Sequence, residues 1–296
     1  MKNYDFIFFT TCDANEERIN NLLRLLDSID HAIHKQNVRV KHYILLQRVI
    51  EVPKQLSSKL SKDREFTVEN ARLSLSRARN IMLNKAIKDS AFHNAEVCAF
   101  PDDDAWYPSG FLAVLINYLR SKPNISIFTC DYGTNPFAKV TEVSDLRINP
   151  KPTDPGEFIR NVSSNTLFLR SDLALSNVFF DEKLGVGAKI NGGEDLDYAL
   201  RAYTKAGNKV VMSKAKLIGH RDRLPWVRSA YFAGSLFAIA RSARNDKSIF
   251  IQMLRKVIVG FYLVLRRELK LSAYLQGLKL GTTGFFRQKL EVGNFD

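Results

Sequence analysis

Three adjacent acidic residues follow an apolar run in this sequence: Asp102, Asp103 and Asp104. Adjacent carboxylates repel one another, so they are either solvated turn residues or ligands of a shared cation. Glu194 with Asp195, and then His220, stand at the ends of other predicted elements. Oxygen ligands with at most one imidazole and no thiolate favour Mg²⁺ or Mn²⁺ over zinc. Such an ion can neutralise the charge on a leaving diphosphate, which is metal-assisted group transfer.

The hydrophobic pattern predicts the strands that would position these groups. Apolar runs alternate with helical patterns in the first half, which indicates an α/β fold with parallel strands and crossover helices. Strands are expected at 4–9, 42–46, 66–68, 97–100 and 125–130, and then within 163–173 and 209–220. The fourth strand runs directly into the three aspartates. They are therefore expected at the carboxyl end of a strand, where open α/β sheets bind ligands.

Helix signals occur between these strands. Helices are expected to begin near Asp13, near Ser74 or Ser76, near Ser109 and near Gly193. Asp13 would be the N-cap of the first helix, with Glu16 in the capping-box position. The segment 136–155 carries four of the nine prolines, which predicts a long ordered loop of the kind that shapes substrate sites.

Length and composition exclude several classes of protein. A chain of 296 residues with 45% apolar content can bury a substantial core. The three cysteines include no CxxC pair, which fits reduced core thiols in a cytosolic protein better than a disulfide framework or a cysteine zinc site. The apolar stretch near the N-terminus is too short for a signal peptide, so export is not expected.

The formal charge of +13 is unevenly distributed. Residues 201–296 contain 19 basic and five acidic side chains, so the excess belongs to the C-terminal third. A solvated surface, an anionic membrane or a nucleic acid would each account for it. No known nucleic-acid-binding motif accompanies the charge, so nucleic acid is not the expected partner.

Six pieces of sequence occur in a recognisable order. They are FIFFTTCDANEERINNLLRLLDSI, SRARNIMLNKA, FPDDDAWYPSGFL, FDEKLGVG, GGEDLDYALRA and a late histidine in GHRD. Together they resemble the family-2 glycosyltransferases of bacterial cell-surface polysaccharide assembly, over roughly residues 4–230. The resemblance implies an α/β GT-A fold, a mixed sheet flanked by helices, here with a C-terminal helical appendage. It also implies an inverting hexosyltransferase, with a UDP-sugar as the expected donor and a saccharide as the acceptor.

The resemblance assigns roles to individual residues. Asp104 and Asp102 match the DxD-type motif and, with His220, would hold Mn²⁺ or Mg²⁺. Asp195 matches the general base that deprotonates the acceptor hydroxyl, with Glu194 beside it. The nucleotide-sugar would contact residues on the first strand, the second helix and the two acidic motifs: Thr10, Thr11, Arg79, Asn80, Asp102, Asp103 and Gly193.

Elementary chemistry supports the role of Asp195 independently. An inverting transfer needs one carboxylate base at the acceptor oxygen, opposite the leaving diphosphate, and a metal makes a second acid dispensable. A helix start would favour the anionic form of Asp195, and Gly192 and Gly193 would let the backbone approach the sugar. One departure is that the second strand ends in Gln47 and Arg48, where relatives usually place an aspartate. The nucleotide base therefore stays open.

The chain divides into a predicted catalytic domain, 1–225, and a basic, aromatic-rich helical region, 226–296. The longest uncharged runs in the second region, 229–240 and 257–265, fall short of the roughly 20 residues that span a bilayer. Helices that are apolar on one side and basic on the other could lie on the inner face of an anionic membrane, near a lipid-linked acceptor. Packing on the catalytic domain explains the same pattern equally well.

Two other functions stay open from the sequence. Paired aspartates could hold two metals in a nucleotidyl or phosphoryl transferase, although no glycine-rich phosphate loop accompanies them. The basic C-terminal third could serve a nucleic-acid-binding protein, with Phe and Tyr stacking on bases. Structural readings also exist for single residues, with Asp195 as a helix-terminal carboxylate and His220 as the partner of Asp222.

Overall fold

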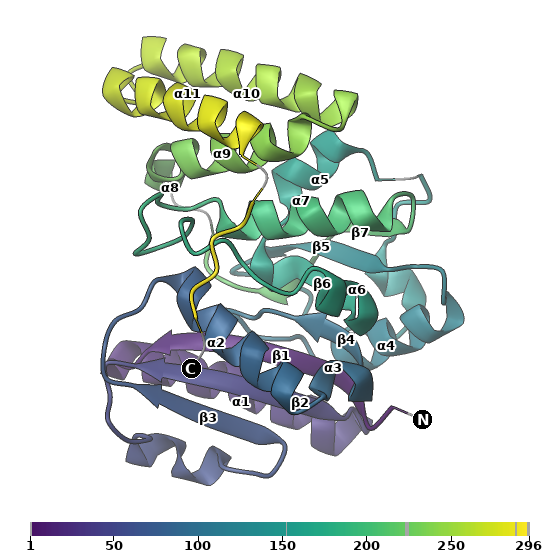
Figure 1. Cartoon of the computed structure of the whole chain (residues 1–296). Helices are drawn as coiled ribbons and strands as arrows, with labels where there is room; N and C mark the ends of the chain where they lie inside the picture. The colour runs from purple at the N-terminus through teal and green to yellow at the C-terminus, as the bar shows by residue number, and fades with distance from the viewer. Residues whose placement is uncertain (1, 152, 223–224, 288, 295–296) are drawn as a thin grey trace.

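The computed structural model describes residues 2–151, 153–222, 225–287 and 289–294 (Figure 1). Seven strands form one sheet in the order β3-β2-β1-β4-β6-β5-β7. Their bounds are β1 (Tyr4–Asp13), β2 (Val40–Gln47), β3 (Arg64–Glu69), β4 (Ala95–Ala99), β5 (Ile127–Gly133), β6 (Leu167–Arg170) and β7 (Val210–Gly219). Strands β1 to β4 run parallel, β6 is antiparallel to both β4 and β5, and β7 is parallel to β5. The predicted α/β sheet is confirmed, with one antiparallel strand inside it.

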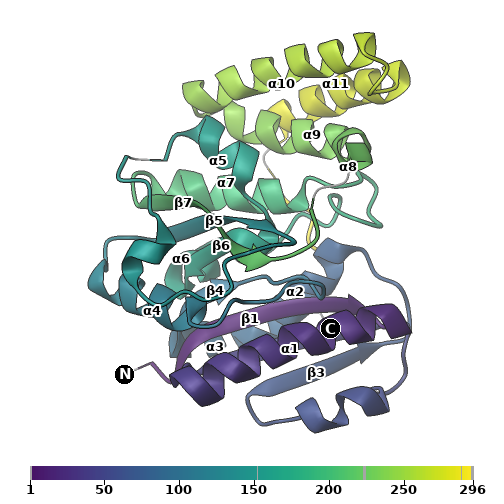
Figure 2. The same cartoon turned by 180° about the vertical axis from the view of Figure 1, so that it is seen from behind.

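Helices cover both faces of the sheet. Figure 2 shows α1 (Glu16–Gln36) and α4 (Phe111–Ser121) on one face. The other face carries α2 (Leu75–Lys88), α3 (Ala91–Asn94), α5 (Pro155–Asn161), α6 (Ser171–Ser176) and α7 (Glu194–Ala206). Side chains alternate along β1 because successive residues of a strand point to opposite faces. Phe6 and Phe8 therefore join the core under α1 and α4, while Ile7 and Phe9 join the core under α2 and α7.

The first helix begins later than the sequence predicted. Strand β1 continues through Asp13, which pairs with Gln47 of β2, so the predicted capping box of Asp13 and Glu16 is wrong. Asn15 caps α1 instead, and its side-chain oxygen accepts the N–H of Arg18 at 2.9 Å. The reason is that β1 extends to Asp13 and α1 begins only at Glu16, so Asn15, the residue directly before the helix, takes the cap.

Two other local predictions are confirmed. Ser74 is the N-cap of α2, and its hydroxyl accepts the N–H of Arg77 at 3.4 Å. In its described residues 136–151 the proline-rich segment is an ordered loop that contains a 3-10 turn at Val143–Leu146, and Pro152 lies outside the described part of the chain. Ile148 in this loop forms a bridge with Ser213 of β7, so the loop is attached to the edge of the sheet.

The C-terminal region is helical and layered on the rest of the molecule (Figure 1). Its helices are α8 (Pro225–Ala230), α9 (Phe232–Ala243), α10 (Lys247–Leu265) and α11 (Leu271–Phe286). Helix α9 packs against α7, and α10 and α11 pack against α9. The predicted division between 225 and 226 adjoins residues 223–224, which lie outside the described part of the chain, and it stays a prediction.

Within the described residues, α10 alone meets the length and hydropathy of a membrane-crossing helix, and only 17% of its apolar window is buried. The length of the longest uncharged run is a stricter criterion than mean hydropathy, because Arg255 and Lys256 divide α10 into two shorter uncharged runs. Length and hydropathy therefore do not exclude α10 as a span.

Candidate active site

The chemically suggestive residues meet at the end of the sheet where β1 and β4 finish, α7 begins and β7 leads into His220. They surround a cavity of about 340 Å³. Its lining includes Thr11, Asp13, Arg18, Gln47, Arg72, Leu73, Asp102, Asp103, Asp104, Glu194, Asp195, His220, Arg221 and Tyr231. This is the edge of the sheet at which parallel strands present their carboxyl ends, as the sequence predicted.

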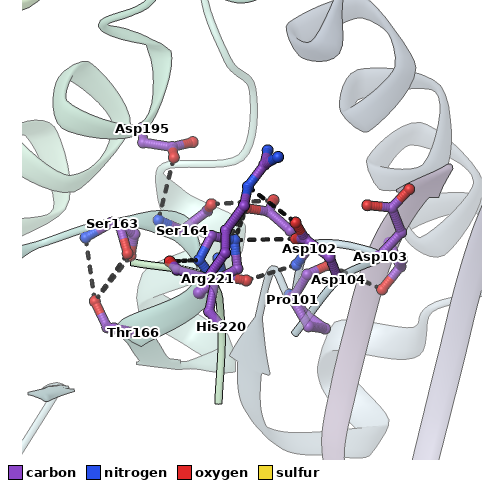
Figure 3. Close-up of polar contacts among 12 residues, drawn as sticks. Pro101, Asp102, Asp103, Asp104, Ser163, Ser164, Thr166, Asp195, His220 and Arg221 are labelled. Carbon is purple, nitrogen blue, oxygen red and sulfur yellow. Dashed lines mark hydrogen bonds and ion pairs between the residues drawn. The ribbon is translucent and has the colours of Figure 1, made fainter. Parts of the chain in front are cut away.

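The three adjacent aspartates do not share one environment (Figure 3). Asp102 accepts hydrogen bonds from the Asn165 amide at 2.8 Å and from Arg79 at 3.1 Å. Asp103 pairs instead with Arg18, whose Nη1 lies 2.7 Å from its Oδ1. Burial raises the pKa of Asp103 to about 7, against the lowering effect of Arg18. The neighbouring carboxylates of Asp102 and Asp103 therefore bind different partners: an amide and a guanidinium for Asp102, and another guanidinium for Asp103.

Asp104 and His220 are in direct contact. His220 Nε2 lies 2.9 Å from Asp104 Oδ1, and Arg221 Nε lies 3.2 Å from Asp104 Oδ2. Burial alone would raise the pKa of Asp104, but the hydrogen bond and charge of His220, together with Arg221, lower it below its usual value. Burial alone would lower the pKa of His220, but Asp104 and Asp102 raise it. Each group therefore stabilises the charged form of the other.

Asp102, Asp104 and His220 have the geometry of a cation site. One ligand atom from each lies within 4.8 Å of the other two. Two carboxylates and one imidazole are a donor set that Mg²⁺ and Mn²⁺ accept. His220 Nδ1 lies 2.8 Å from the Arg221 carbonyl oxygen. A proton on Nδ1 would be donated there, which leaves the Nε2 lone pair directed at the carboxylates, as in metal-binding histidines. The residues fit the divalent ion that the sequence predicted.

Arg79 joins the two acidic groups. Its side chain is 2% exposed, with Nη1 2.5 Å from Asp195 Oδ1 and Nη2 3.1 Å from Asp102 Oδ1. The Ser164 N–H donates to Asp195 Oδ2 at 3.2 Å, and the Ser164 hydroxyl donates to Asp102 at 3.4 Å. A planar guanidinium holds two carboxylates at a defined spacing. Arg79 is not part of the cavity lining given above. It therefore positions both acidic residues from outside the cavity.

Gly193 places the start of α7 against the backbone of α9. Its φ of +87° suits glycine, and a Cβ there would lie 2.3 Å from the carbonyl group of Gly234. Gly192 has a φ of +73°, and a Cβ there would lie 2.6 Å from the ring of Tyr231. The glycines before Glu194 thus allow a close approach between two helices, and the predicted contact between Gly193 and the sugar stays a prediction.

Glu194 is buried next to Asp195. Its side-chain Oε2 has no hydrogen-bond partner among the described residues. Burial, reinforced by the charge of Asp195, raises the pKa of Glu194 to about 8, although Arg79 acts in the opposite direction. An ordinary glutamate titrates near 4.5. The folded protein therefore binds a proton at Glu194 over a pH range in which the unfolded chain has lost it.

This raised pKa predicts a pH-dependent stability. Between pH 4.5 and about 8 the folded state holds the Glu194 proton and the unfolded state does not, so the free energy of unfolding falls as the pH rises through this window. Glu194→Gln should flatten that slope, by on the order of a few kcal/mol across the window at most. Chemical denaturation at several pH values measures this, with exposed Glu17→Gln as the control. An unchanged slope in Glu194→Gln would contradict it.

Three predicted binding residues take different positions. Thr11 lines the cavity. Thr10 is buried in the sheet, where its hydroxyl donates to the Pro101 carbonyl at 3.0 Å and supports the segment that carries the aspartates. Asn80 is buried in α2, and its side chain bonds the backbone of Phe180 in both directions. The cavity lining given above includes neither Thr10 nor Asn80, and a donor contact from them stays a prediction.

Several residues of the site were not foreseen from the sequence. They are Arg18, Ser164, Asn165, Arg221 and Tyr231. The strand pattern placed 163–173 in one strand but did not reveal its direction. Because β6 is antiparallel to β4, the residues just before β6 lie beside the carboxyl end of β4. This direction brings Ser164 and Asn165 to Asp102.

Comparison with known proteins finds similarity among solved structures, while no family model and no curated protein matches the chain. S. aureus TarS 1-349 in complex with UDP-GlcNAc is 15% identical, with a TM-score of 0.62 over 93% of this chain and 79% of that chain. TarS 1-349 alone is 14% identical, with a TM-score of 0.63 over 95% and 80%. TarS 1-349 with UDP is 15% identical, with a TM-score of 0.57 over 84% and 70%. At this identity the likeness shows the fold, which is the mixed α/β GT-A fold that the sequence predicted.

Proposed function

We propose that this protein is a metal-dependent inverting glycosyltransferase that moves a sugar from a nucleoside-diphosphate donor to a saccharide hydroxyl. The observation that carries the proposal is the meeting of two groups in one cavity: a metal-binding set, Asp102, Asp104 and His220, and the carboxylate of Asp195. Transfer from a sugar diphosphate uses both kinds of group. One stabilises the leaving group, and the other accepts the proton of the attacking hydroxyl.

Asp102, Asp104 and His220 would hold Mn²⁺ or Mg²⁺, which when bound would neutralise charge on the departing diphosphate. Positive side chains in the same lining support a diphosphate ligand as well. Arg18, Arg72 and Arg221 all face this cavity. A guanidinium can bind phosphate oxygens through two parallel N–H groups, so these arginines suit a doubly or triply charged ligand.

Asp195 is the proposed general base. Its two carboxylate oxygens take one hydrogen bond each, from Arg79 and from the Ser164 N–H, and each oxygen keeps further acceptor capacity. These contacts fix the orientation of the carboxylate in the cavity. In the reaction the acceptor oxygen bonds to the anomeric carbon, the bond from that carbon to the diphosphate oxygen breaks, and the acceptor proton passes to Asp195. Attack opposite the leaving group inverts the anomeric centre.

The classes of donor and acceptor are proposed on separate grounds. TarS binds UDP-GlcNAc and UDP, which supports a UDP-sugar as the donor here. The proposed acceptor is a saccharide or a lipid-linked saccharide, in the assembly of cell-surface polysaccharide. The proposed location is the cytoplasm, at the inner face of the membrane.

A two-metal nucleotidyl or phosphoryl transferase has less support. Asp103 is paired with Arg18 at 2.7 Å and is not one of the three residues of the cation site. Among the residues that the structure describes, that cation site is the single group with metal-binding geometry.

Binding of a nucleotide-sugar is expected to depend on both metal and Asp104. A donor that binds only the folded state stabilises it by about 2.7 kcal/mol at 100 times its Kd. Thermal unfolding with UDP-, GDP-, CMP- and dTDP-sugars, with and without Mn²⁺, measures this stabilisation. We expect one nucleotide to stabilise the wild type only with metal, and Asp104→Ala to lose the effect.

Exposed Asp172→Ala is the matched control, because it removes an aspartate from α6, outside the cavity. It should keep the full metal-dependent stabilisation. Stabilisation without metal, retained in Asp104→Ala, would count against the metal role. No stabilisation by any nucleotide would count against the glycosyltransferase as a whole.

A further inference from the structure

Helix α10 lies in the outermost layer of the molecule (Figure 1). It exposes a stripe of apolar side chains. Each member lies three or four residues from another member along the helix, which puts them on one side of it. They are Ile251, Leu254, Ile258, Phe261, Tyr262 and Leu265, exposed by 45% to 68%. We call this stripe the α10 face. A group of large exposed apolar side chains of this kind marks an interaction surface.

The other side of α10 is already occupied. Ile249 and Leu263 are buried, and Gly260 lies against the ring of Phe232 from α9. Gln252 reaches the backbone of α5 near Gly156. The α10 face is therefore the side that remains after the helix has packed on α9 and α5, and it faces outward from the molecule.

The charge around the α10 face is almost entirely positive. Residues 247–287 contain eight lysines and arginines and a single acid, Glu268, which pairs with Arg266 at 2.7 Å. Arg255, Arg267 and Lys270 are exposed beside the apolar residues. Basic residues near a membrane surface are attracted to anionic lipid headgroups. A second copy of the same face would bring like charges together, which opposes self-association.

We propose that the α10 face docks on an anionic lipid bilayer, with α10 lying in the plane of the membrane. Arg255 and Lys256 are the ninth and tenth of the 19 residues of α10, so a spanning α10 would place two charges at the centre of the bilayer. Spanning would also remove α10 from α9. Lying in the interface inserts the apolar stripe and leaves the basic residues at the headgroups.

Docking would bring the catalytic cavity to the membrane. Helix α9, which carries α10 and α11, packs against α7, and the first residues of α7 are Glu194 and Asp195 of the cavity lining. The membrane and the cavity are then separated by two packed helices. The inference that docking brings the enzyme to a lipid-linked acceptor rests on the proposed function. The inference that α10 docks on the membrane does not.

Flotation of the full chain with vesicles tests the proposal. The vesicles are phosphatidylcholine alone, or phosphatidylcholine with about one-third phosphatidylglycerol, at about 0.15 M salt. The wild type should float with the anionic vesicles and not with the neutral ones. Ile258→Glu should lower the bound fraction roughly tenfold or more, because it replaces an exposed isoleucine that would insert into the membrane with a negative charge. Ile50→Glu is the matched control, since Ile50 is 79% exposed in the loop after β2, and it should float like the wild type.

Each alternative gives a distinct result. No flotation of the wild type, or equal flotation of Ile258→Glu, overturns the proposal. A dimer that Ile258→Glu abolishes, without vesicle binding, assigns the face to a second copy. If oligonucleotides displace the protein from the vesicles and Ile258→Glu still binds the vesicles like the wild type, the basic residues are assigned to nucleic-acid binding. Retention in vesicles through carbonate extraction shows that α10 spans, which also overturns the proposal.

The same variants separate this inference from the proposed function. Metal-dependent stabilisation by a nucleotide-sugar should be equal in the wild type, Ile258→Glu and Ile50→Glu, because neither isoleucine lines the cavity. Loss of flotation with retained donor binding supports the docking surface, and flotation without donor binding leaves docking intact while the proposed function fails.

Discussion

Asp195→Asn is expected to lower turnover by about 10²- to 10⁴-fold, the usual contribution of a positioned general base. The amide is isosteric, and its single oxygen can accept from either the Ser164 N–H or Arg79, which both donate to Asp195, but the side chain no longer accepts the proton of the acceptor hydroxyl. Donor binding should persist, because the proposed metal ligands Asp102, Asp104 and His220 are unchanged. The measurement is the transfer rate at saturating donor and acceptor, together with the metal-dependent thermal shift.

Exposed Asp172→Asn is the control for this variant, since it removes one charge outside the cavity. Its transfer rate should stay within a small factor of the wild type. A transfer rate for Asp195→Asn within tenfold of the wild type would place the base elsewhere. Loss of donor binding in Asp195→Asn would instead indicate that Asp195 acts on the donor, through Arg79 and Asp102.

Arg241→Met is expected to destabilise the folded protein by about 3–5 kcal/mol, the usual cost of breaking a buried ion pair by removing one partner. Arg241 of α9 is 3% exposed, with Nη2 2.5 Å from Asp181 Oδ2 and Nη1 2.9 Å from Asp197 Oδ1. Both carboxylates are buried, so water cannot replace the lost guanidinium. The midpoint of thermal unfolding should fall by on the order of 10 °C.

Arg244→Met tests the same chemistry three residues away, at an exposed position, and should change the stability by less than about 0.5 kcal/mol. A double-mutant cycle combines Arg241→Met with Asp181→Asn. The double variant should recover part of the loss, because Asp181 no longer leaves an unpaired buried charge. We call Arg241, Asp181 and Asp197 the ion triad. Equal stabilities for Arg241→Met and Arg244→Met would show that the ion triad does not hold α9 in place.

The Arg241 result also bears on the predicted division after residue 225. Asp197 lies in α7 and Arg241 lies in α9, so the ion triad crosses the predicted boundary. A large destabilisation would show that α9 belongs energetically to the catalytic unit. The sequence placed this basic residue in an appendage because nothing in its local pattern distinguishes a buried arginine from a solvated one.

The architecture could be predicted because it depends on local periodicity. The continuous apolar run of β1 and the helical spacing in α1 are properties of neighbouring residues, and they indicated the parallel half of the sheet. The same local reasoning failed at Asp13, where pairing with Gln47 across two strands extends β1. The direction of β6 also escaped prediction, because an apolar run has the same composition whichever way the strand runs.

The candidate site divides in the same way. Local signals were enough to predict which titratable groups stand at element ends, since Asp102, Asp104 and His220 follow strand signals and Asp195 lies in the first turn of a helix. Tertiary structure alone decided their partners. Arg79 bridges to Asp195 across 116 residues of sequence, and Arg18 draws Asp103 away from its neighbours across 85. Contacts over such separations depend on strand order and direction, which local physical chemistry does not specify until the chain has folded.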